Sequence, residues 1–138
     1  MAAPHKFNIF SRDLADKKHN FGSDTFKVML SNTAPISSNA VKTDITEIVA
    51  GSGYAAGGTA TAITESTSAG TYKAVGATVV ITAAGGTIGP FRYAVLYNDT
   101  AATKPLVCWW DNGEAITLAS GEAFSIVFDA TNGILQIA

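Results

Sequence analysis

The sequence is poor in cysteine, histidine and charged side chains. One cysteine, Cys108, and two histidines, His5 and His19, occur in 138 residues, which excludes a disulfide framework within the chain and a multi-cysteine zinc site. Charged residues make up 14% of the chain, and nine Lys and Arg against eleven Asp and Glu leave a net charge of -2. Because nucleic-acid binding depends on clustered positive charge, we expect no nucleic-acid partner.

Long apolar runs are also missing. The most apolar stretch, residues 74–86, is interrupted by Thr and Gly and is shorter than the about 18 residues that a membrane span needs. The first twenty residues contain no apolar block of signal-peptide length. We therefore expect no membrane partner and no export by that route, and the chain length predicts a single domain.

The chain does contain many short runs with the period of a β-strand. Alternation places Phe26, Val28 and Leu30 on one face of the run 25–30, and Phe91, Tyr93, Val95 and Tyr97 on one face of the run 91–97. Nine runs are separated by turn sequences: 25–30, 45–49, 59–64, 73–82, 91–97, 105–110, 115–118, 122–129 and 133–138. They predict an all-β fold, a single-domain antiparallel β-sandwich of jelly-roll type or a β-barrel, over residues 25–138.

Residues 1–24 form a weakly basic arm ahead of these runs. Residues 1–30 carry five Lys and Arg against three Asp, a charge of +2, while the rest carries four against eight, a charge of -4. The segment 11–18, SRDLADKK, predicts at most one short helix, with Ser11 as its N-cap and Asp13 in its first turn. The arm is either a solvated start of the chain or a docking element for an acidic partner.

No motif indicates a catalytic or cofactor site. The sequence GSGYAA at 51–56 fits the dinucleotide pattern G-x-G-x-x-A, but no helix is predicted after it, so we interpret it as a glycine-rich turn. Cys108 lies in an apolar run far from both histidines, which favours a buried structural thiol. DNGE at 111–114 indicates a tight turn rather than part of a catalytic carboxylate pair. We predict no enzymatic activity, no metal and no cofactor.

Two further features favour contact with a partner. Trp109 and Trp110 are adjacent, so in a strand they point to opposite faces, and one of them is free to contact another subunit or a ligand such as a sugar. Residues 50–70, dense in Gly, Ala, Thr and Ser, form either a long loop or a flat β arm.

Four segments together resemble a family of small virion proteins of tailed bacteriophages. They are FKVMLSNTAP from residue 26, TDITEIVAGSGYAAGGTA from residue 43, GPFRYAVLYNDTAATKPLVCWWDNGE from residue 89 and FSIVFDATNGILQIA from residue 124. The resemblance lies in an F-K-V-x-L strand, a G-x-G-Y-x-x-G-G segment, an R-Y-x-V-L-Y-N-x-T strand followed by K-P-L-V, and a closing G-I-L-x-I strand. It covers the chain from about Phe26 to the end and leaves the arm to Gly22 outside.

The resemblance implies a head decoration, or cement, protein that binds the major capsid protein on the outer capsid surface of the virion. Binding only to the mature shell would stabilise that state. Alternatives are a tail- or fibre-associated virion protein and, in another class, a carbohydrate-binding module. The resemblance carries no catalytic residues.

Such a role also predicts self-association as a dimer or trimer. We predict a subunit interface at Trp109 or Trp110, and capsid contacts in the arm and in residues 50–70. The contact candidates are His5, Lys6, Phe7, Phe10, Arg12, Lys17, Lys18 and Tyr54.

Overall fold

Strands dominate the part of the chain that the computed structural model describes, residues 3–138; Met1 and Ala2, with which the predicted arm begins, lie outside it. In chain order the elements are β1 (His5–Lys6), α1 (Phe10–Ala15), β2 (Phe26–Ser31), the 3-10 helix η1 (Lys42–Asp44), β3 (Thr59–Thr61), β4 (Ile63–Ser68), β5 (Thr71–Gly76), β6 (Val79–Thr82), β7 (Ile88–Asn98), β8 (Leu106–Leu118), β9 (Ala123–Ile126) and β10 (Leu135–Ile137). The paired strands are antiparallel, which confirms the predicted all-β fold class.

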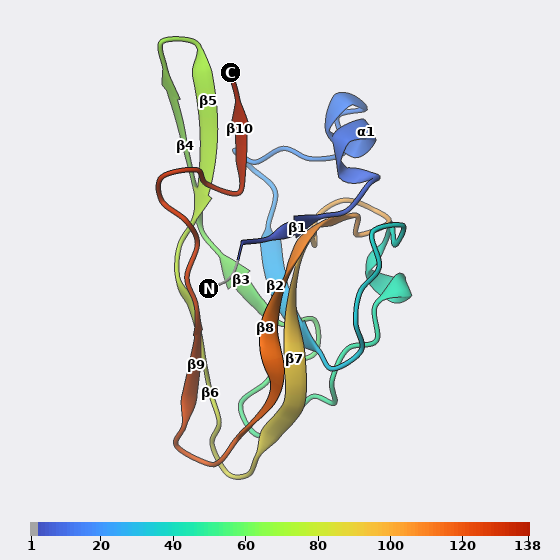
Figure 1. Ribbon diagram of the computed structural model, residues 1–138, viewed down its shortest axis with the longest axis vertical. Helices are drawn as coiled ribbons and strands as arrows, with labels where there is room; N and C mark the ends of the chain where they lie inside the picture. Colours follow the sequence, from blue (N-terminus) through green and yellow to red (C-terminus); the bar gives the residue numbers. More distant parts are fainter. Residues whose placement is uncertain (1–2) are drawn as a thin grey trace.

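The strands form two layers (Figure 1). One layer is the five-stranded sheet β1-β8-β7-β2-β3. The other consists of the three-stranded sheet β10-β5-β4 and, below it in Figure 1, the ribbon β6-β9. β5 and β6 follow each other closely along the chain, so the second layer runs along the length of the molecule. The architecture is a β-sandwich.

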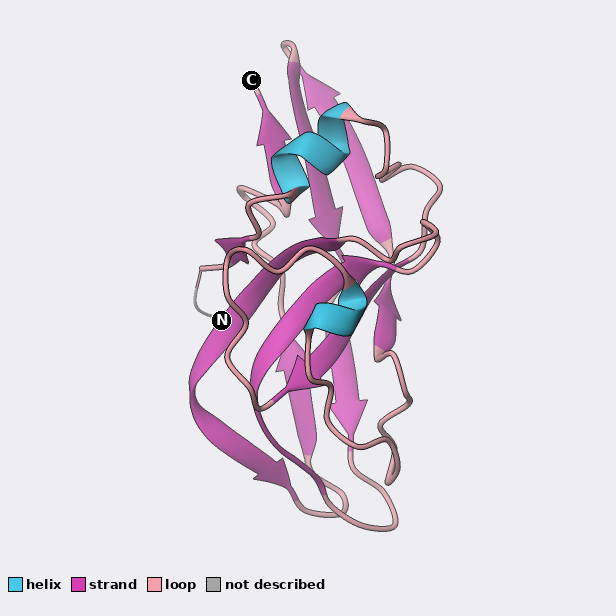
Figure 2. Cartoon of the chain, turned by 90° about the vertical axis from the view of Figure 1, so that its right-hand side faces the viewer, coloured by secondary structure: helices cyan, strands magenta, loops and turns pink. Residues whose placement is uncertain are grey.

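Both faces of the five-stranded sheet are apolar. Phe26, Val28 and Leu30 point from β2 into the main core between the layers, as the alternation predicted. Met29 points the opposite way, into a second buried cluster that contains Phe7, Ile45, Val95, Tyr97 and Leu106. The long connection between β2 and β3, which carries η1, lies in front of this second face (Figure 2). A strand covered on both sides explains why the run 25–30 ends in three consecutive apolar residues, Val28, Met29 and Leu30.

Phe91 does not lie on the face that the alternation predicted for it. The pairing of β7 with β8 is irregular between Phe91 and Tyr93, and such an irregularity changes which face a side chain points to. Phe91 therefore belongs to the main core, where its ring meets Phe124 edge-on at 5.1 Å, while Val95 and Tyr97 face the second cluster.

The sequence DNGE does not separate two strands, so the predicted tight turn is wrong. Phe91 of β7 stands opposite Ile116 of β8, and Tyr93 stands opposite Asp111. Between these two pairs β7 moves by two residues, while β8 moves by five. The extra residues of β8 form a bulge within a continuous strand. Gly113 has a φ of 92° and donates its N–H to Asp111 Oδ1 at 2.8 Å. The positive φ and the side-chain hydrogen bond that are typical of a turn therefore lie within the bulge.

The segment after β2 is organised by the carboxylate of Glu47. Its Oε1 accepts hydrogen bonds from the Tyr54 hydroxyl at 2.8 Å and from the Gly57 amide at 2.6 Å. The Tyr54 hydroxyl in turn accepts the Leu30 N–H at 2.9 Å, which ties this loop to β2. The structure has no strand at 45–49, where one was predicted. Glu47 forms only an isolated bridge with Ser31 there, because this segment is held as a loop by its side-chain hydrogen bonds.

α1 begins at Phe10, with Ile9 at the N-cap position and no capping side chain, so the cap predicted at Ser11 is wrong. Packing fixes the start of this helix, because the Phe10 ring is buried in the main core. Asp13 lies in the first turn as predicted, but it is 2% exposed and pairs with Lys18 at 3.2 Å. Across residues 3–138 no helix is long and apolar enough to span a bilayer.

Candidate docking face around Trp109

The arm lies along the body (Figure 1). β1 pairs with the outer side of β8, with His5 opposite Trp109 and Lys6 opposite Cys108. Phe7 and Phe10 follow directly and are 0% and 3% exposed. Both rings are core residues, so they are not available as surface contacts.

A buried polar cluster fastens the second half of the arm. His19 is 7% exposed, and its Nδ1 lies 3.3 Å from the Asn98 side-chain nitrogen. That nitrogen carries two hydrogens and has three possible acceptors within reach, of which Asp24 Oδ2 is the nearest. Asn98 also donates to Asp24 Oδ2 at 2.8 Å and to the Lys18 carbonyl at 3.3 Å. Asn98 therefore joins the end of β7 to the arm.

Acid is expected to destabilise the fold through His19. Burial is the largest influence and lowers the pKa of His19 below 6.5, although nearby Asp13 and Asp24 act in the opposite direction. The unfolded chain then takes up the proton at higher pH than the folded chain. Stability from this group is complete above pH 6.5 and is lost as the pH falls, by at most about 1.4 kcal/mol per pH unit.

The measurement is urea unfolding at about pH 7.5 and about pH 5.5, a window in which histidine titrates and ordinary carboxylates do not. His19→Gln should flatten the pH dependence of the unfolding free energy. His5→Gln, at the exposed histidine of β1, is the comparison variant that removes the other imidazole of the chain. Equal slopes in the wild type and His19→Gln would contradict the assignment.

Trp109 and Trp110 point to opposite faces of β8, as predicted. Trp110 is 3% exposed and packs edge-on against Phe128 in the main core, with ring centroids 5.3 Å apart. Trp109 is half-buried on the outer face. The His5 ring stacks on it at 5.1 Å, and the Phe7 ring lies 4.5 Å away. Of the two tryptophans, Trp109 is the one that a partner can reach.

An ion pair stands beside Trp109 on the same face. Nε and Nη2 of Arg92 donate to the two carboxylate oxygens of Asp111 at 2.8 and 3.1 Å. The guanidinium also lies 5.5 Å from the ring centre of Tyr93. The hydrogen bond from Arg92 is the main cause that keeps the pKa of Asp111 below its ordinary value, so the pair stays ionised at neutral pH.

These residues define the Trp109 face: His5, Arg92, Tyr93, Trp109 and Asp111. Sequence reasoning found His5 and Trp109 but missed the other three. These three residues could have been found by pairing the predicted strands 91–97 and 105–110. The bulge in β8 prevents the sequence from showing which residues of the two strands stand opposite each other. Lys6 follows His5 on β1 and points to the opposite side of the strand, where it is exposed and its Nζ donates to Ser11 Oγ at 2.7 Å.

The remaining predicted contact residues lie elsewhere. Arg12 and Lys17 are exposed in and after α1, and Lys18 pairs with Asp13. Tyr54 is 3% exposed, with its hydroxyl already bonded, so it is a structural residue.

The predicted buried thiol is confirmed. Cys108 is 5% exposed, and burial raises the pKa of its thiol. At neutral pH this sulfur is therefore protonated and unreactive.

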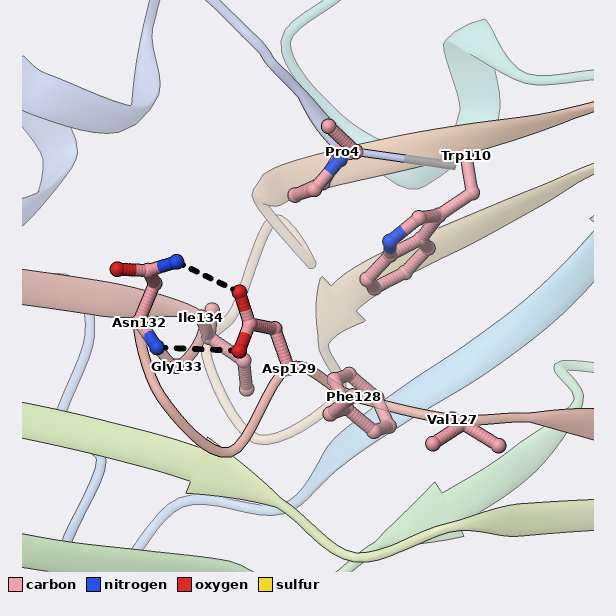
Figure 3. A pocket seen from close by; sticks show the side chains of 9 residues that line it. Pro4, Trp110, Val127, Phe128, Asp129, Asn132, Gly133 and Ile134 are labelled. Carbon is pink, nitrogen blue, oxygen red and sulfur yellow. Dashed lines mark hydrogen bonds between the residues drawn. The ribbon is translucent and has the colours of Figure 1, made fainter. Parts of the chain in front are cut away.

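A hollow of about 490 Å³ lies on the Trp110 side of β8, opposite to the Trp109 face, between Pro4 and the loop that follows β9 (Figure 3). Trp110, Phe128 and Ile134 give it apolar walls. Asp129 is the single acidic or basic side chain among its described lining residues. Its carboxylate accepts hydrogen bonds from the backbone of Thr131 and Asn132 and from the Asn132 side chain. The hollow thus offers a fit for an apolar group rather than a pair for acid and base catalysis.

No family model, no curated protein and no solved structure matches this chain. Inferences about function therefore depend on the resemblance of the four sequence segments, on the residues of the Trp109 face and on the fold that positions them.

Proposed function

We propose that this protein is a structural protein of a tailed-phage virion. In this role it is a head decoration protein that binds the major capsid protein on the outer capsid surface, acts as a homo-oligomer and stabilises the mature shell. The resemblance of the four segments supports the virion role. The observation that supports docking on a protein surface is the Trp109 face. Protein interfaces are enriched in Trp, Tyr and Arg, and this face places one of each side by side on a rigid sheet.

The face is organised before any partner arrives. Arg92 and Asp111 already hold each other through two hydrogen bonds, and the register of β7 with β8 fixes Trp109 and Tyr93. Side chains that are ordered in the free protein lose little entropy on docking, so more of the contact free energy appears as affinity. A protein that binds only the mature shell then adds that affinity to the stability of the mature state.

The same face favours a protein partner over a sugar. A sugar-binding platform needs an aromatic ring with an open face next to polar side chains. Here the His5 ring stacks on the indole of Trp109 with an interplanar angle of 25° and occupies that position. The exposed remainder of the ring suits an edge contact within a larger interface.

The test is cryo-electron microscopy of capsids that lack this protein after mixing with the purified chain. Regular density on the shell is expected for the wild type. Arg92→Ala should lower the affinity for shells by about tenfold or more, the effect of an interface hot spot. Arg12→Ala is the comparison, because its guanidinium is exposed on α1 and is not part of the Trp109 face. It should leave the affinity unchanged if the Trp109 face, rather than the predicted arm contact, makes the docking contact.

The other outcomes are equally informative. Density only at the tail would overturn decoration and favour a tail- or fibre-associated protein. Bare particles would overturn both virion roles. Shell binding that Arg92→Ala leaves intact would keep decoration and remove the Trp109 face as the docking surface.

A further inference from the structure

β4 is the longest strand in the described chain that has a neighbour on one side only. It pairs with β5 through all six residues, Ile63 to Ser68, and stands at the end of the sheet order β10-β5-β4. No further backbone hydrogen bond reaches these six residues within residues 3–138. In an antiparallel pair alternate residues turn their N–H and C=O groups away from the partner, so β4 presents free backbone groups along its outer side.

The usual protection of a sheet edge is missing from β4. Natural edges are blunted by short length, proline, lysine or a bulge. β1 has two residues, includes Lys6 and follows Pro4, and β3 and β10 have three residues each. β4 has six residues in unbroken register with β5, and it contains neither proline nor lysine. The β4–β5 hairpin also stands away from the five-stranded sheet at one end of the molecule (Figure 1).

The one charge of β4 is already engaged. Glu65 Oε2 accepts the Tyr72 hydroxyl at 2.8 Å. Its Oε1 lies against the arm at Gly22, 2.6 Å from where a Cβ atom of that residue would stand. Glu65 therefore points to the face of the sheet that meets the arm. The outer side of β4 presents hydroxyl side chains and backbone.

We propose that β4 pairs antiparallel with β4 of a second copy of this chain. The pairing joins two three-stranded sheets into one of six strands, β10-β5-β4-β4-β5-β10. It names the surface for self-association, and in that respect it rests on the proposed function. Backbone groups supply the contact, as in other cases of strand addition at a sheet edge.

Symmetry, strand overlap and charge set the register of this pair, and the longest overlap centres it on one of the two middle residues of β4, Glu65 or Ser66. In a two-fold antiparallel pair, residues of the same face stand opposite each other, so the pair is centred on one residue. Centring on Glu65 would place two carboxylates opposite each other, which is destabilising. Centring on Ser66 places Glu65 opposite Thr67 of the partner subunit and sets the two Ser66 residues face to face. Thr64 then stands opposite Ser68 of the partner subunit, so hydroxyl side chains pair with hydroxyl side chains and no like charges face each other.

The test uses one introduced cysteine. In Ser66→Cys the two sulfurs meet across the two-fold axis, within the Cα separation that a disulfide requires. The natural Cys108 is buried and does not compete. Mild oxidation by oxidised glutathione is expected to give a disulfide-linked dimer of Ser66→Cys on a non-reducing gel. Ser125→Cys, at an exposed serine of β9, is the control and should remain a monomer.

Sedimentation gives a second measurement without a cross-link. The wild type is expected to have the mass of two chains. Ser66→Glu places two carboxylates opposite each other across the axis, while within its own chain the new side chain stands opposite Lys73, so it should have the mass of one chain with an unchanged circular dichroism spectrum. A wild-type monomer at about millimolar concentration, where even weak association is visible, would overturn the pairing. So would a Ser66→Cys chain that cross-links no faster than Ser125→Cys.

Capsid binding is measured on the same samples, so the two proposals can fail separately. A dimer that leaves shells bare keeps the β4 pairing and removes decoration. A monomer that decorates shells does the reverse.

Discussion

Deletion of residues 1–22 is expected to unfold the chain rather than only detach it from a partner. The arm buries three phenylalanine rings: Phe7 at 0%, Phe10 at 3% and Phe21 at 6% exposure. Phe21 stacks face to face on Phe26 of β2 with centroids 4.5 Å apart. Truncating one buried Phe costs about 3–5 kcal/mol, so losing three such rings is comparable with the about 5–15 kcal/mol that holds a whole domain.

Thermal unfolding followed by circular dichroism measures this effect. The deletion variant should show no cooperative transition near the wild-type temperature. The control keeps the arm and replaces its exposed charges, Lys6→Ala, Arg12→Ala and Lys17→Ala, and should unfold within a few degrees of the wild type because each exposed change costs at most about 0.5 kcal/mol. A deletion variant with the wild-type transition would contradict the structural role of the arm.

This expectation changes how docking experiments with the arm are interpreted. If deletion unfolds the protein, the loss of capsid binding that follows says nothing about contact between arm and shell. Point changes at exposed arm residues such as Lys6 and Lys17 separate the two effects, because both side chains reach the surface without filling the core.

The position of the arm was beyond prediction from the sequence for a physical reason. In β2 the period of two decides which side chains are buried, so Phe26, Val28 and Leu30 were placed correctly. Phe7 and Phe10 have a helical spacing of three residues, but Phe7 precedes α1 and Phe21 follows it, so no single helix or strand carries all three rings. Their burial depends on contacts with β2, β7 and β8, and such contacts between distant segments leave no local pattern.

The candidate docking face was also predictable only as far as the local period of the strand allows. Adjacent residues in a strand point to opposite faces, and that rule alone separates Trp109 from Trp110. Placing Arg92 and Asp111 beside Trp109 requires the register of β7 against β8. The bulge after Asp111 sets that register, and the sequence DNGE looks like an ordinary turn until the partner strand is known.

Gly58→Ala is expected to destabilise the protein severely, by more than about 4 kcal/mol, because it combines backbone strain with an overlap that cannot relax. Gly58 has φ +83°, a left-handed conformation that costs a non-glycine residue about 1–2 kcal/mol. A Cβ atom there would also overlap the carbonyl of Val28 and stand 2.8 Å from the Cα of Met29. Both obstacles are backbone atoms of β2, which is held between β7 and β3.

Gly85→Ala is the matched control for this prediction. Gly85 has a similar φ of +76°, but an added Cβ would meet nothing within 4 Å, so only the strain remains and about 1–2 kcal/mol should be lost. Urea unfolding of both variants separates overlap from strain. Equal losses would mean that β2 and β3 can move apart. A larger loss for Gly58→Ala would establish that the second glycine of the pair 57–58 is required by the close approach of two strands, and that this part of the G-x-G-Y-x-x-G-G segment serves the fold rather than a ligand.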